Sequence, residues 1–116
     1  MKVAVDVKGT LEGPKREQIL RLMMFFQDQG YEVVVWSNFY SFADDAVKDL
    51  AETSLKDIIA ECKKAKWETE EQYDIAIEDD RSQTWLAVKN FIWVDEIPLD
   101  TPIAFVKERL ASLLTD

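Results

Sequence analysis

Four short apolar runs alternate along the chain with segments of helical periodicity, and this alternation limits the possible folds most. The runs cover residues 2–7 (KVAVDV), 31–36 (YEVVVW), 73–77 (YDIAI) and 91–94 (FIWV). The continuous apolar end of the second run is typical of a strand buried on both faces. Strands that alternate with helices predict a parallel sheet with right-handed crossovers.

The segments between the runs carry helix-start signals followed by apolar residues at helical spacing. A glycine-proline pair precedes the first of these segments, and serine or threonine precedes the others. Helices are predicted to begin at Pro14, Ser41, Ser54, Ser82 and Thr101.

Residues 41–66 have helical character throughout, so they leave no room for a further strand. We therefore expect about four strands in the spatial order fourth, third, first, second. Helices on both faces of such a sheet make a three-layer α/β/α sandwich with a Rossmann-like parallel sheet. A length of 116 residues fits a single α/β domain over residues 1–116.

Composition excludes several classes of function. The chain has 14 basic and 23 acidic residues, a net charge of −9, which disfavours nonspecific binding to nucleic acid or to anionic membranes. It has no histidine and one cysteine, Cys62, which excludes histidine-assisted nucleophiles and multi-cysteine zinc sites. A bound metal is expected to be a hard ion such as Mg²⁺ held by oxygen.

No apolar run approaches the length of a membrane span, about 20 residues. The first residues, MKVAVDVKG, lead directly into the first predicted strand and do not resemble a signal peptide. We therefore expect a cytoplasmic protein without a membrane partner.

Polar residues follow all four predicted strands, where parallel sheets bind their ligands. Asp6 is the penultimate residue of the first run, Ser37 follows the second, residues 78–80 (EDD) follow the third and Asp95 follows the fourth. Helix capping explains Asp95 well. Capping explains three consecutive acids poorly, because adjacent carboxylates repel unless a cation lies between them.

These strand ends resemble the haloacid dehalogenase (HAD) superfamily, whose members are mostly Mg²⁺-dependent phosphohydrolases. The first family motif, Asp-x-Asp-Gly-Thr-Leu after an apolar strand, is similar to VAVDVKGTL, with matches at Asp6, Gly9, Thr10 and Leu11.

The later motifs of the family have counterparts in the same order. VVVWSN supplies Ser37 and Asn38 for the second motif, Lys56 is the best-placed lysine for the third, and IAIEDDR supplies Asp79 and Asp80 for the fourth. The resemblance spans residues 2–95.

The resemblance implies a phosphomonoester substrate, an aspartyl nucleophile at Asp6 and a bound Mg²⁺. The implied metal ligands are Asp6, Asp79 and Asp80. The implied phosphate-binding residues are Gly9, Thr10, Ser37 and Asn38. Lys56 would pair with the charged nucleophile and the phosphate.

Lys8 departs from the family pattern, which has a second aspartate there as general acid and base. Lysine is a poor base near neutral pH, and loss of general acid–base catalysis typically costs roughly 10²–10⁴ in rate. The Lys8 ammonium can pair with Asp6 in place of the metal, or it can lie in solvent. Weak phosphatase or phosphotransferase activity and a catalytically inactive binding protein both stay open.

An acidic-cluster nuclease of the PIN type is a third possibility, with Asp6, Asp44, Asp79 and Asp95 around Mg²⁺. The net charge and the Lys8–Leu11 loop argue against it. The short chain has no room for a cap over the site. The expected partner is therefore a small or macromolecular phosphorylated substrate that enters an open face, or a protein partner.

Overall fold

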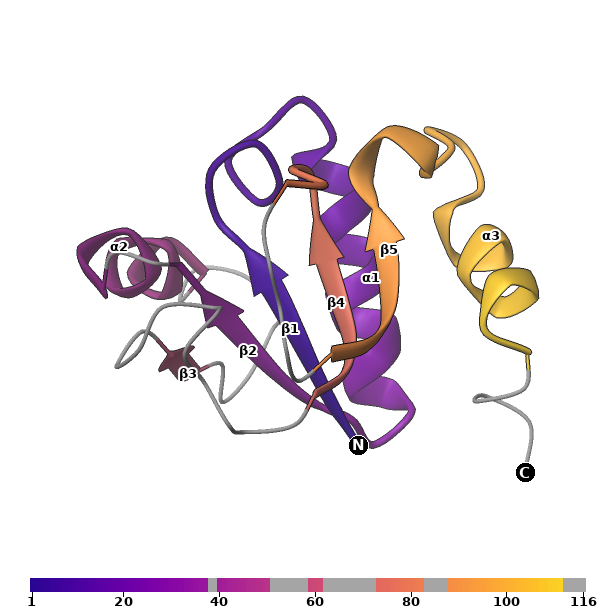
Figure 1. The fold of residues 1–116 in the computed structure, drawn as a ribbon, viewed down its shortest axis with the longest axis horizontal. Helices are drawn as coiled ribbons and strands as arrows, with labels where there is room; N and C mark the ends of the chain where they lie inside the picture. The colour runs from indigo at the N-terminus through magenta and orange to yellow at the C-terminus, as the bar shows by residue number, and fades with distance from the viewer. Residues whose placement is uncertain (38–39, 51–58, 62–72, 83–87, 112–116) are drawn as a thin grey trace.

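The structure is a computed structural model of the chain, and it describes residues 1–37, 40–50, 59–61, 73–82 and 88–111. Five strands form one parallel sheet in the order β3-β2-β1-β4-β5 (Figure 1). The strands are β1 (Lys2–Asp6), β2 (Glu32–Trp36), β3 (Ile59–Glu61), β4 (Tyr73–Glu78) and β5 (Val88–Trp93). The helices are α1 (Arg16–Asp28), α2 (Tyr40–Leu50), α3 (Pro102–Arg109) and the short 3₁₀ helix η1 (Val94–Glu96).

The prediction of about four strands misses one strand at the edge of the sheet. Ile59–Glu61 was predicted to be helical but forms β3, which pairs in parallel with β2 from Val34 to Trp36. The observed strand order therefore has one strand more than the predicted order, because β3 lies at the edge of the sheet next to β2. The error has a physical reason, because a short apolar run cannot be assigned to helix or strand by periodicity alone.

The other element bounds shift by a few residues. β5 begins at Val88, where the sequence predicted the end of a helix from Ser82, and Val94 belongs to η1 instead of the strand. Residues 51–58, 62–72 and 83–87, which hold parts of the helices predicted from Ser41, Ser54 and Ser82, lie outside the described residues. The first helix begins at Arg16, two residues after the predicted proline start.

The described helices cover one face of the sheet. The apolar stripe of α1 is fully buried there, against alternate residues of the central strands. Ala46 and Leu50 of α2 and Val106 of α3 belong to the same core cluster. Figure 1 shows α1 running behind the strands and α3 beside β5.

The opposite face of the sheet is also buried. Ala4, Val34, Trp36, Tyr73 and Ala76 form a second cluster there, with Val88 and Phe91 packed against it. Trp36 meets Tyr73 edge to face, with ring centroids 5.2 Å apart. A helical layer on this face, which a three-layer sandwich requires, is not seen within the part of the chain that the structure describes.

The strand order reverses between β1 and β4. The chain proceeds from β1 outward to β2 and β3, and β4 then lies on the other side of β1. In parallel sheets a ligand crevice forms at such a reversal, beyond the carboxyl ends of the strands. In Figure 1 the segments that follow β1, β4 and β5 lie at this same end of the sheet. No helix among the described residues has the length and apolar character needed to cross a membrane.

Candidate metal and phosphate site

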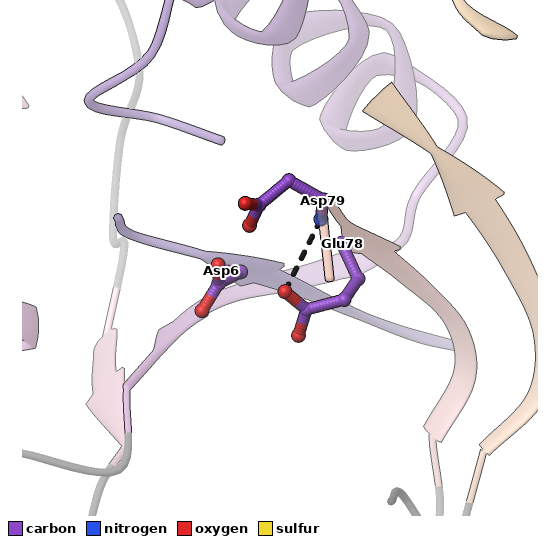
Figure 2. A group of neighbouring side chains, drawn as sticks. All are labelled: Asp6, Glu78 and Asp79. Atoms are coloured by element: carbon purple, nitrogen blue, oxygen red, sulfur yellow. Dashed lines mark hydrogen bonds between the residues drawn. The ribbon is translucent and has the colours of Figure 1, made fainter. Parts of the chain in front are cut away.

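Three carboxylates meet where the strand order reverses. Asp6 ends β1, Glu78 ends β4 and Asp79 follows directly, and one carboxylate oxygen of each lies within 4.8 Å of the others. Figure 2 shows the three side chains gathered from the two strand ends. Asp6 and Glu78 are buried, with exposed fractions of 8% and 1%, while Asp79 is exposed.

Strand register explains why these acids meet. β1 and β4 pair in parallel with Val5 opposite Ile77, so Asp6 and Glu78 each come one residue later. Alternation then directs both side chains to the face that carries Ala4 and Ala76. Indoles flank the pair on either side, because Trp36 is the register partner of Asp6 and Trp93 that of Glu78.

A tight turn after β1 brings the backbone over Asp79. The amide of Thr10 donates to Val7 O at 3.3 Å, and the amide of Leu11 donates to Asp6 O at 3.2 Å. Gly9 has a φ of +78°, and a Cβ built there would lie 2.1 Å from Asp79 Oδ2. Only glycine fits both the left-handed backbone and this close approach.

The Thr10 side chain faces the carboxylates. It is completely buried, and its hydroxyl lies 3.1 Å from Asp79 Oδ1 and 3.4 Å from Asp6 Oδ2. One hydroxyl proton can serve only one of these acceptors at a time. The sequence pointed to phosphate contact for Thr10, whereas in this structure its hydroxyl links the two acids.

Lys8 lies at the surface and pairs with a neighbouring acid. Its Nζ donates to Glu12 Oε1 at 2.6 Å, and 59% of its side chain is exposed. Of the two orientations that the sequence left open, the structure has the solvent-exposed one.

Glu78 and Asp80 have different surroundings from those the sequence suggested. Glu78 Oε1 accepts from the amides of Asp79, at 3.1 Å, and Asp80, at 3.4 Å. Asp80, expected as a metal ligand, instead accepts from the amide and hydroxyl of Ser82 at 2.9 and 2.6 Å. Glu78 was not singled out as a ligand. The two-residue alternation from Ala76 could have placed it on the Asp6 face.

The other residues predicted for the site are Ser37, Asn38 and Lys56. Ser37 follows β2 and is buried, with 6% exposed, at the same end of the sheet as Asp6. Asn38 and Lys56 lie outside the described residues.

Arg81 contributes the basic charge next to the acidic run. Its guanidinium donates to Asp95 at 2.7 Å and to Glu96 at 3.4 Å. The hydrogen bond between Arg81 and Asp95 lowers the pKa of Asp95 and raises the pKa of Arg81. Asp95 therefore pairs with Arg81, and it does not belong to the described carboxylate group.

The donor set of this group fits a hard divalent cation. Its three ligand candidates are all carboxylates, the class that Mg²⁺ prefers, and they come from two adjacent strand ends. Two of them are buried, and neighbouring buried carboxylates repel unless a positive charge lies between them.

Comparison with known proteins finds no relative of this chain. A scan against family models finds no match, and searches of curated proteins and of solved structures find none either. The site is therefore interpreted from its own residues.

Proposed function

We propose that the chain is a HAD-like, Mg²⁺-dependent phosphohydrolase or phosphotransferase that acts on a phosphomonoester through Asp6. The observation that carries the proposal is the meeting of Asp6, Glu78 and Asp79 within 4.8 Å at the reversal of strand order. Asp6, Gly9 and Thr10 stand at matching positions of the family's first motif, and Ser37 lies at the end of the adjacent strand.

The proposed reaction begins with attack of an Asp6 carboxylate oxygen on the phosphorus. The new O–P bond forms as the bond to the ester oxygen breaks, and water then hydrolyses the aspartyl-phosphate. A bound Mg²⁺ supplies neutralisation of the charge on the transferring phosphoryl group. Asp6, Glu78 and Asp79 would hold the cation, and the Ser37 hydroxyl would donate to a phosphate oxygen.

Lys8 determines how fast we expect the proposed hydrolysis to be. It stands where the family has its general acid, yet its ammonium is paired with Glu12 at the surface. Water must then protonate the leaving oxygen, which lowers the rate by roughly 10²–10⁴ relative to a positioned acid. We therefore expect slow turnover.

The exposed Lys8 also favours a second candidate, a HAD-like protein that binds Mg²⁺ and phosphate without turnover. The PIN-like alternative has less support. Of its four aspartates, Asp6 and Asp79 lie in the carboxylate group, Asp95 is paired with Arg81, and the side chain of Asp44 lies outside the described residues.

Hydrolysis of an aryl phosphate, followed with and without Mg²⁺, tests the proposal. Wild-type protein should release product only with the cation, and Asp6→Asn should reduce release to the uncatalysed background. Asp28→Asn is the matched control, because it makes the same charge change at the exposed end of α1. Unchanged activity in Asp6→Asn would refute the nucleophile. Binding of Mg²⁺ and inorganic phosphate with no product would favour the binding protein.

A further inference from the structure

Asp79 differs from the other two carboxylates in how it is held. Asp6 and Glu78 belong to paired strands, whereas Asp79 lies on the turn that follows β4 and is exposed. Its carboxylate position therefore depends on what fixes residues 79–82. On one side, Thr10 donates to it and Gly9 closes over it. A separate set of contacts fixes the other side.

Arg81 ties the turn to the end of β5. Its guanidinium contacts Asp95 at 2.7 Å and Glu96 at 3.4 Å, and it lies 4.9 Å from the centroid of the Trp93 ring. Trp93 in turn stacks on Phe91 with an angle of 3° between the rings. Two anions and an aromatic face thus hold one planar cation, an arrangement that suits arginine better than lysine.

The segment that holds Arg81 is itself anchored to α1. Asp95 and Glu96 belong to η1, and Lys15 Nζ donates to the carbonyls at both ends of this segment, Val94 O at 2.8 Å and Ile97 O at 2.6 Å. Arg109 of α3 adds an ion pair to Glu96 at 3.2 Å. A continuous series of contacts therefore runs from Lys15 through η1 and Arg81 to the turn with Asp79.

We propose that Arg81 is a positioning residue for the cation site, fixing the Asp79 turn against η1 so that the third carboxylate reaches the ion. This inference rests on the proposed function, because it takes the three carboxylates to bind Mg²⁺. Arg81 acts through Asp79 and does not touch the cation. Groups that hydrogen-bond a metal ligand typically contribute 10- to 100-fold in affinity. Arg81 bonds Asp95 and Glu96 instead of a ligand, and these pairs are exposed, so we expect an effect at the low end, about 10-fold.

Calorimetric titration of the full chain with Mg²⁺ alone tests this role. Arg81→Met, which keeps the apolar stem, should raise the Kd about 10-fold. Arg81→Lys should recover part of the loss, because an ammonium can still pair with Asp95 but cannot bond both acids in a fork. Arg21→Met is the matched control, since Arg21 pairs with Glu17 on the exposed side of α1.

Lys15→Met tests the same series of contacts at its other end. It also serves as a second test of the positioning role if Arg81→Met does not fold. It should also weaken Mg²⁺ binding. The double variant should lose less affinity than the product of the two single losses, because both changes release the same turn. Wild-type protein that fails to bind Mg²⁺ contradicts the proposed function. Wild-type protein that binds, with Arg81→Met or Lys15→Met equal to Arg21→Met, overturns the positioning role alone.

Discussion

The Thr10 hydroxyl lies 3.1 Å from Asp79 Oδ1, a contact that joins residues 69 positions apart in the sequence. Thr10 is completely buried, whereas Asp79 is exposed. The same hydroxyl lies 3.4 Å from Asp6 Oδ2, so it contacts acids from both strand ends. The turn after β1 and the turn after β4 are thereby linked at the candidate site.

Thr10→Val should weaken Mg²⁺ binding about 10-fold, because it keeps the shape of the side chain but removes the donor to Asp79. Thr10→Ser retains the hydroxyl and should bind within a few-fold of wild type. Calorimetric titration of both variants checks this expectation. Equal affinities for the valine and serine variants contradict a role for the hydroxyl.

Gly9→Ala should destabilise the fold more than Gly30→Ala does. Both glycines have positive φ values, +78° and +85°, so both substitutions carry the left-handed penalty of about 1–2 kcal/mol. At Gly9 the new Cβ also meets Asp79 at 2.1 Å, whereas nothing lies within 4 Å at Gly30. Urea unfolding should therefore show Gly9→Ala to be less stable than Gly30→Ala by at least about 1 kcal/mol. Equal losses would mean that Asp79 moves aside freely.

Lys8→Asp should raise phosphate ester hydrolysis by roughly 10²–10⁴, since it supplies the missing general acid. Stability should change by less than about 1 kcal/mol, because the Lys8–Glu12 pair is exposed. Lys8→Asn is the control, as it removes the ammonium without adding an acid. A gain that appears equally in the asparagine variant assigns the effect to charge removal.

Lowering the pH should remove the contribution of the Arg81–Asp95 pair to the stability of the fold. The hydrogen bond from Arg81 holds the pKa of Asp95 below its ordinary value of 3.8. A carboxyl with a depressed folded-state pKa stabilises the fold above its unfolded pKa, and the contribution is lost as pH falls through the folded value.

The comparison of wild type with Asp95→Asn measures this effect. The difference between their urea midpoints should be constant near neutral pH and should close below pH 3.8. Added salt should shrink the same difference, because the pair is exposed. A difference that widens in acid contradicts the assignment.

Much of the central sheet could be predicted because its residues are continuous and apolar. Residues 32–36 lie between two other strands, and their run of valines has few alternatives to a buried parallel strand. The stripe of α1 was equally clear, since Ile19, Leu22 and Phe26 repeat at helical spacing and are all fully buried. β3 could not be predicted in this way, because its three residues obtain their strand geometry from pairing with β2.

Some residues of the candidate site could be predicted from the sequence and others could not. Asp6 and Asp79 follow from the position of acids at strand ends, which is a local signal. Glu78, for which the sequence predicted no role, joins Asp6 and Asp79 because β4 extends one residue beyond the apolar run. Asp80 accepts hydrogen bonds from Ser82. The orientation of Lys8 and the contacts of Arg81 depend on partners that lie 4 and 14 positions away, and spacing alone does not reveal them.

Asp6 and Glu78 place two buried carboxylates at adjacent strand ends, and on the proposed function this couples folding to the concentration of the bound cation. Two buried carboxylates at neighbouring strand ends repel each other when both are charged. A divalent cation that binds only the folded chain offsets the repulsion by mass action, adding about 2.7 kcal/mol at 100 times its Kd. On the proposed function, the melting temperature of this protein reports the free concentration of the cation that it binds.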